Sequence, residues 1–307
     1  MEKRLTNSAM IFSVGFVFML VCAVGAFFYG VQIGMDKVEA GYEAKRLEEA
    51  QASRTDGNPY QQQDLVSFYH TVFSPYREFQ NEWLNAMSKL SQGQSDDFGD
   101  VMSNLSKLAE RKSQEASSYD MGKSIRLGDA QVAYFRSLKQ FAKAASAGAS
   151  LAKKESGDKL YAAIANETSY KTAVKETLDA QSHYYAAMQL WAATIDSDIP
   201  GELPKQQVLS MKEWSALPLT AKNGVVAQYL KEYNQLKPFY PQDMTARVDD
   251  FITSGQASKM KLQTASAVID LLLSTDAVRS GDFTKSFNRL YPNQLLPQLP
   301  FFLPSAP

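Results

Sequence analysis

Cysteine is almost absent from this sequence. The one that occurs, Cys22, lies inside the longest apolar stretch of the chain. The rest of the chain can therefore form neither a disulfide bond nor a metal site built on thiolates. Secreted animal proteins of this size usually carry disulfides, so the shortage of cysteine favours a protein of the bacterial cell envelope.

Net charge is also nearly absent. The 32 lysine and arginine residues balance 33 aspartate and glutamate residues, which leaves a formal net charge of −1. Such a chain lacks the excess of basic residues that binding to a phosphate backbone requires, and we expect no nucleic acid among its partners. Glycine is scarce too, at 16 of 307 residues, which favours a helical protein.

Motifs that carry chemistry are missing as well. Residues 122–124 (Gly-Lys-Ser) match the end of a phosphate-binding loop, but Ser117 stands where that loop needs a glycine. Of the two histidines, only His183 has an acidic residue one helical turn away on its face, Asp179. Two such ligands are too few for a metal centre. We therefore predict no catalytic residue, no cofactor and no metal site, and a chain that is not an enzyme.

Two pairs of adjacent carboxylates occur in the chain, Asp96–Asp97 and Asp249–Asp250. Both fall in predicted loops or near helix starts, where acidic side chains cap free backbone N–H groups. We interpret them as caps and solvated surface charges rather than as general acids and bases. Asp97 in particular is placed to cap the helix that follows it.

Charged residues are missing between Arg4 and Asp36. The densest apolar part, residues 9–29, would span about 30 Å as a helix, which matches one hydrocarbon core. We predict a transmembrane helix over residues 9–34, after a short basic tip over residues 1–8. A cleavable signal peptide is the alternative, although its apolar region is usually only about 7–15 residues long.

The basic tip suggests an orientation for this helix. Lys3, Arg4 and the terminal amine precede it, as in an uncleaved signal-anchor, which leaves the N-terminus inside. We expect a single-pass protein of the cell membrane whose helical domain faces outward.

Small residues four apart mark one face of the same helix, Ala26, Gly30 and Gly34. This spacing lets two membrane helices approach closely, so it suggests a homodimer through the transmembrane helix. The competing interpretation is that glycine and alanine are simply common in membrane helices. After the helix, residues 35–60 read as a charged helical stalk that ends in a turn-rich linker.

Proline is missing between Pro75 and Pro200. A stretch this long without proline, with apolar residues recurring three and four apart, predicts an antiparallel bundle of long helices over residues 61–198. Pro75 should kink the first helix or mark a restart. We expect the four helices at about 62–90, from 98 onward, 124–147 and 159–195.

The first of these helices carries the strongest periodic signal in the chain. Its apolar residues recur from Leu65 to Leu90 on a single face, which predicts the main contribution to the core. On the second helix, we expect the apolar side to consist of Phe98, Val101, Met102, Leu105 and Leu108.

Prolines return after residue 198, and the helices should become shorter. Over residues 199–290 we expect these helices to pack on the bundle rather than to form a separate domain. Their predicted positions are about 220–236, 241–253, 257–273 and 283–290.

The last segment, residues 291–307, has five prolines and should be extended rather than helical. Its large apolar residues are costly to leave in water. They have two destinations: a groove on the chain's own bundle, or docking to another envelope protein. The residues that would carry this docking are Leu295, Leu296, Leu299, Phe301 and Phe302.

Together these features predict an all-α protein with one transmembrane helix, a long-helix bundle, shorter C-terminal helices and an extended tail. The function that fits best is a non-catalytic, membrane-anchored module that binds or scaffolds a partner at the cell envelope. One alternative is a sensor that binds a small ligand outside the cell and acts through a partner. Another is a cell-wall enzyme whose site is assembled from residues far apart in the sequence.

Overall fold

The computed structural model describes Met19 and residues 60–303, apart from 95–96, 118, 120, 122–123 and 204–207. The predicted basic tip, transmembrane helix and stalk, including Ala26, Gly30 and Gly34, lie outside these residues except for Met19 and Tyr60. Among the residues that are described, no helix is both long and apolar enough to cross a bilayer.

Regular structure in the described part of the chain is helical, which confirms the predicted all-α class. An isolated bridge joins Ser210 and Thr264. The helices of the first half are α2 (Gln62–Phe68), the π-helical turn η1 (Tyr69–Phe73), α3 (Ser74–Ser91), α4 (Phe98–Ser117), α5 (Ile125–Leu151), α6 (Gly157–Asn166) and α7 (Thr168–Ile195).

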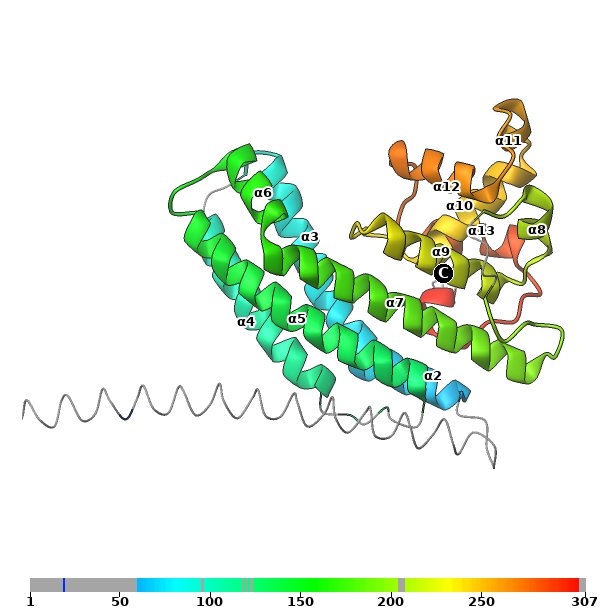
Figure 1. The fold of residues 1–307 in the computed structure, drawn as a ribbon, viewed down its shortest axis with the longest axis horizontal. Helices are drawn as coiled ribbons and strands as arrows, with labels where there is room; N and C mark the ends of the chain where they lie inside the picture. The colour runs from blue at the N-terminus through cyan, green and yellow to red at the C-terminus, as the bar shows by residue number, and fades with distance from the viewer. Residues whose placement is uncertain are drawn as a thin grey trace, which may run out of the picture. The chain divides into compact units, whose positions relative to one another are not determined.

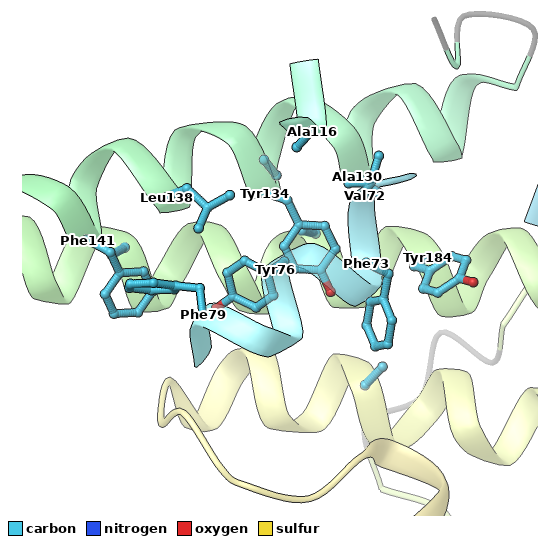
Figure 2. Close-up of a cluster of buried hydrophobic side chains, with 14 of the residues drawn as sticks. Val72, Phe73, Tyr76, Phe79, Ala116, Ala130, Tyr134, Leu138, Phe141 and Tyr184 are labelled. Atoms are coloured by element: carbon cyan, nitrogen blue, oxygen red, sulfur yellow. The ribbon is translucent and has the colours of Figure 1, made fainter. Parts of the chain in front are cut away.

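The long helices α3, α4, α5 and α7 pack side by side with alternating directions, as an antiparallel bundle (Figure 1). The apolar face predicted for the first helix forms the centre of this bundle, and every residue of that face is buried except the half-buried Tyr69. Figure 2 shows the rings of α3 meeting those of α5. The Tyr76 and Tyr134 ring centroids are 4.5 Å apart, and those of Phe79 and Phe141 are 5.0 Å apart.

Burial of these rings removes apolar surface from water and so stabilises the bundle. An aromatic side chain removes about 150–250 Å² from water. At about 25 cal/mol per Å², that is roughly 4–6 kcal/mol for each ring, as an upper value.

Pro75 is accommodated by a change of helix type rather than by a sharp break. Its nitrogen carries no hydrogen, and its ring would crowd the carbonyl of Thr71 in a regular α-helix. The π-helical turn lies directly before it, so that α3 begins at Ser74 with Pro75 in its first turn. The predicted kink or restart is therefore a wider turn within one continuous helical segment.

The predicted fourth helix, 159–195, is two helices, so its continuity was wrong. Glu167 has an extended backbone, with φ −65° and ψ 134°, and separates α6 from α7. Its carboxylate accepts hydrogen bonds from the backbone N–H groups of Ser169 and Tyr170. The side chain acts as the N-cap of α7. This role was not predicted, because glutamate is a helix former and is not among the residues preferred at N-caps.

The end of the helix predicted at 124–147, and the loop expected after it, were placed too early, because α5 continues to Leu151. Gly148 is buried inside this extension. A Cβ atom there would lie 3.4 Å from side-chain atoms of Ile164 and Met102. The small residues are therefore a contact surface within a helix, where neighbouring helices approach closely, rather than a loop.

The second half of the chain contains shorter helices. They are α8 (Met211–Ala216), α9 (Leu219–Tyr233), α10 (Pro241–Thr253), α11 (Gln256–Lys259), α12 (Ala265–Ser274), α13 (Asp282–Leu290) and the 3-10 turn η2 (Pro300–Phe302). The helix predicted at 257–273 is interrupted, because Lys261 adopts a left-handed backbone with φ 56°. Helix α8 was not predicted, and it begins with a capping box between Ser210 and Glu213.

The described part of the tail is extended, as expected, apart from η2, which corrects the prediction that this segment contains no helical turn.

Helix α7 joins two apolar cores. One of its faces contributes Tyr184, Tyr185 and Met188 to the core of the bundle. Another contributes Val174 and Leu178 to a second core with residues of α8, α9, α10 and α12. In Figure 1 the C-terminal helices lie along one side of α7. Residues 57–307 accordingly form one compact unit.

Candidate functional site

The tail residues that were predicted to dock lie against the chain's own helices. Leu299 and Phe302 are 0% and 2% exposed and belong to the bundle core, while Leu295, Leu296 and Phe301 are half-buried. This arrangement agrees with the first of the two predicted destinations. Docking of the tail to another protein stays a prediction.

Phe301 is held by aromatic rings near the π-helical turn. Its centroid lies 5.6 Å from that of Tyr69, 5.5 Å from Phe73 and 5.4 Å from Tyr240, on whose ring it stacks. Offset and edge contacts of this kind stabilise beyond area burial, by about 0.5–1.5 kcal/mol for each pair. The tail is therefore an element of the folded unit.

The two histidines are not brought together. His70 is exposed, with its ring edge-on to that of Tyr69. His183 Nδ1 lies 3.9 Å from Asp129, and its Nε2 lies 3.8 Å from Asp179. Burial lowers the pKa of His183, although both carboxylates oppose this shift. Among the described residues, no group of three or more potential ligands has the geometry to hold a metal ion.

Asp249 was interpreted from the sequence as a cap or a solvated surface charge. This interpretation was wrong, because its carboxylate is buried among side-chain donors from other parts of the chain. Its Oδ1 accepts hydrogen bonds from Trp214 Nε1 at 2.7 Å and Lys222 Nζ at 3.0 Å, and its Oδ2 accepts one from the Tyr291 hydroxyl at 2.6 Å. The side chains of Asp249 and Lys222 are only 9% and 12% exposed.

This network connects α8, α9 and α10 with the residue that follows α13. Burial, and next the negative charge of Asp249, raise the pKa of Tyr291, so the phenol remains a neutral donor at physiological pH. Both carboxylate oxygens are occupied by donors of the chain itself. The arrangement is thus suited to holding helices together rather than to binding a substrate.

A groove of about 830 Å³ runs between α3 and α4. Ala86, Phe98 and Leu105 are buried at its floor, Leu108 is half-buried, and Val101 is 39% exposed. Its lining residues are Glu82, Asn85, Ala86, Lys89, Gly93, Gln94, Phe98, Val101, Asn104, Leu105, Lys107, Leu108 and Arg111.

Val101 was predicted on the apolar side of its helix, and the structure leaves this part of the apolar side 39% exposed. At 3.6 residues per turn, Val101 lies about 60° around the axis from Phe98. Phe98, Met102 and Leu105 point into the bundle and are 0–5% exposed. The apolar side of α4 is therefore wider than the surface that its neighbours cover, and its flank faces the groove.

The rim of the groove is mostly cationic. Lys89, Lys107 and Arg111 are exposed there, together with one acidic residue, Glu82. Lys107 also borders a second, polar groove between α4 and α5, of about 640 Å³, whose lining includes Asp100 and Glu110. This groove was not predicted from the sequence, although a helical projection of α4 places Val101 and Arg111 on neighbouring parts of its surface.

A comparison with known protein families, curated proteins and solved structures gives no match to this chain. No activity, ligand or partner is therefore transferred to it from a relative.

Proposed function

We propose that this chain is a non-catalytic helical module, tethered to a membrane through residues 9–34, that binds a partner protein in the α3–α4 groove. The tether is supported by the uncharged run at the N-terminus. Partner binding is supported by one observation above all: the flank of α4, with Val101 exposed and Leu108 half-buried, is not covered by the helices of the described unit.

The composition of the groove fits a protein partner. Its centre is apolar and its rim carries amides and charges, which is the usual arrangement of a protein interface. Between Val101 and Arg111, α4 rises about 15 Å, enough to lie along roughly three turns of a partner helix. A groove of this form supports recognition of a helix that lays its apolar face between two others.

A photo-crosslinking amino acid placed at Asn104 tests the proposal in cells that express the full chain. Asn104 is exposed and lines the groove. We expect a light-dependent adduct with another protein, reduced severalfold by Val101→Asp, which puts a charge on the apolar contact. The control position is Met260, which is 53% exposed and outside the groove.

The proposal fails if no adduct forms at Asn104, or if the same adduct forms equally from Met260 and is insensitive to Val101→Asp.

Self-association of the membrane helix is a separate part of the proposal, supported by the spacing of Ala26, Gly30 and Gly34. Gly30→Leu with Gly34→Leu should abolish dimers of the full chain in mild detergent. Retention of those dimers would exclude this face as the contact.

A further inference from the structure

The charges along the groove are not satisfied by the described part of the chain. Lys89, Lys107 and Arg111 form no ion pair with any described carboxylate, although Glu82 lies on the same groove. Three positive charges and one negative charge leave a local excess of two positive charges on a chain whose overall net charge is −1.

A satisfied cation lies on the same pair of helices for comparison. Lys112 Nζ is 2.7 Å from Glu78 and 3.0 Å from Glu115, and its side chain is 13% exposed. Lys89 and Arg111 are exposed, and no carboxylate among the described residues pairs with them. Lys107 also borders the polar groove between α4 and α5, whose lining includes Asp100 and Glu110. Lys89 and Arg111 are therefore the cations most available to a ligand between α3 and α4.

We infer that the occupant of this groove is an amphipathic α-helix of a partner protein whose apolar face is flanked by acidic residues. This inference rests on the proposed function and specifies the chemistry of the partner. Apolar side chains spaced three and four apart contact Val101, Leu108 and the groove floor. Carboxylates near the two ends of the face meet Lys89 and Arg111.

The floor of the groove argues against an occupant that offers negative charge alone. Beside this floor, Val101 is 39% exposed and Leu108 is half-buried, and a phosphate backbone or a lipid headgroup would not cover their apolar surface. Glu82 on the rim would also repel a continuous polyanion. A helix combines both required features, an apolar face and separated acidic side chains.

The test uses the full chain in phosphatidylcholine nanodiscs, with empty discs as the blank. Three labelled synthetic helices are titrated and followed by fluorescence anisotropy. All three have the same length. The first carries a leucine face flanked by glutamates, and the second carries the same face flanked by lysines. The third keeps the glutamates but has serines in place of the leucines.

We expect the glutamate-flanked leucine helix to bind tightest. Lys89→Glu combined with Arg111→Glu should reverse the preference in favour of the lysine-flanked helix. An exposed ion pair changes affinity by roughly two- to fivefold, so two reversals should change the ratio of affinities by about tenfold or more. Raising the salt to about 0.5 M should shrink this ratio.

A matched control carries the same change of charge elsewhere. Lys212→Glu with Lys285→Glu alters two exposed lysines on α8 and α13 and should leave the preference unchanged. Circular dichroism of each variant reports whether the fold is retained.

Equal affinity for the glutamate- and lysine-flanked helices would overturn the inference. So would equal affinity for the serine-containing helix, because the site would then recognise charge only. Binding to discs that contain phosphatidylglycerol, lost in the double reversal without any selectivity among helices, would assign the cations to a membrane surface. The crosslinking test separates this inference from the proposed function. If any of these outcomes occurs but Asn104 still forms an adduct in cells, the inference fails and the proposed function stands. If the peptides bind selectively but Asn104 forms no adduct, the proposed function fails.

Discussion

Asp249 and Asp250 are adjacent in sequence and identical in chemistry, but substitution by asparagine should affect them very differently. Asp249→Asn removes the charge that compensates Lys222, whose side chain is 12% exposed. It also replaces one of the two carboxylate oxygens by an NH2 donor, which then faces either the indole N–H of Trp214 or the hydroxyl of Tyr291. Removing one partner of a buried, hydrogen-bonded ion pair costs about 3–5 kcal/mol.

Asp250 provides the matched control. Its carboxylate contacts Arg247 at 3.4 Å and Arg289 at 2.6 Å, but these side chains are 34% and 58% exposed. Ion pairs that are open to water stabilise by about 0–1 kcal/mol. Asp250→Asn should therefore cost little, although it removes the same charge one residue away.

Thermal and urea unfolding of the fragment 57–307, followed by far-ultraviolet circular dichroism, measures the difference. In a fragment of this size, 1 kcal/mol corresponds to roughly 2–4 °C in melting temperature. Asp249→Asn should lower the melting temperature by about 6–20 °C, and Asp250→Asn by less than about 4 °C. Adding Lys222→Met to Asp249→Asn should recover part of the loss, because both buried charges are then gone. Equal melting temperatures for the two asparagine variants would refute the assignment of Asp249 to a buried network.

Further predictions concern the core, the tail, alkaline pH and membrane topology. Trp83 is fully buried, so Trp83→Ala should cost roughly 3–5 kcal/mol in urea unfolding; a loss below about 1 kcal/mol would contradict its place in the core. Deletion of residues 292–307 removes Leu299 and Phe302 from that core and should lower the melting temperature, whereas an unchanged value would mean that the tail contributes no packing. Burial raises the pKa of several tyrosines above the ordinary value of about 10, so the unfolded chain releases their protons first and stability should fall as pH rises above about 10; tyrosinate absorbance appearing for all tyrosines while the fold persists would disprove this. The buried tyrosines concerned are Tyr76, Tyr134, Tyr184 and Tyr185. Ser254→Cys in a Cys22→Ser background should react with an impermeant thiol reagent on intact cells, and reaction only after lysis would exclude an outward-facing domain.

The secondary structure was predicted where it depends on neighbours along the chain. The absence of proline between Pro75 and Pro200 and the apolar period from Leu65 to Leu90 were sufficient for the helical class and for the face that forms the core. Both signals are local, because helix hydrogen bonds join residues four apart and one apolar face recurs with the same spacing. Helix ends were less predictable. By local propensity, Glu167 favours the interior of a helix and Gly148 favours its end. In the structure, Glu167 instead caps α7 through its hydrogen bonds, and Gly148 lies inside α5 because neighbouring helices pack closely against it.

The candidate site depended on contacts between distant parts of the chain. Sequence by itself determined that Val101 is one of several apolar residues on α4, and tertiary packing decided that it stays 39% exposed beside α3. Likewise, Asp249 is one of two adjacent carboxylates in the sequence, but its donors come from residues 27, 35 and 42 positions away. The composition of the chain and the periodicity of its apolar residues indicate which side chains can be buried. Which of them are buried, and against which partner, depends on how helices of fixed local form fit against one another in three dimensions.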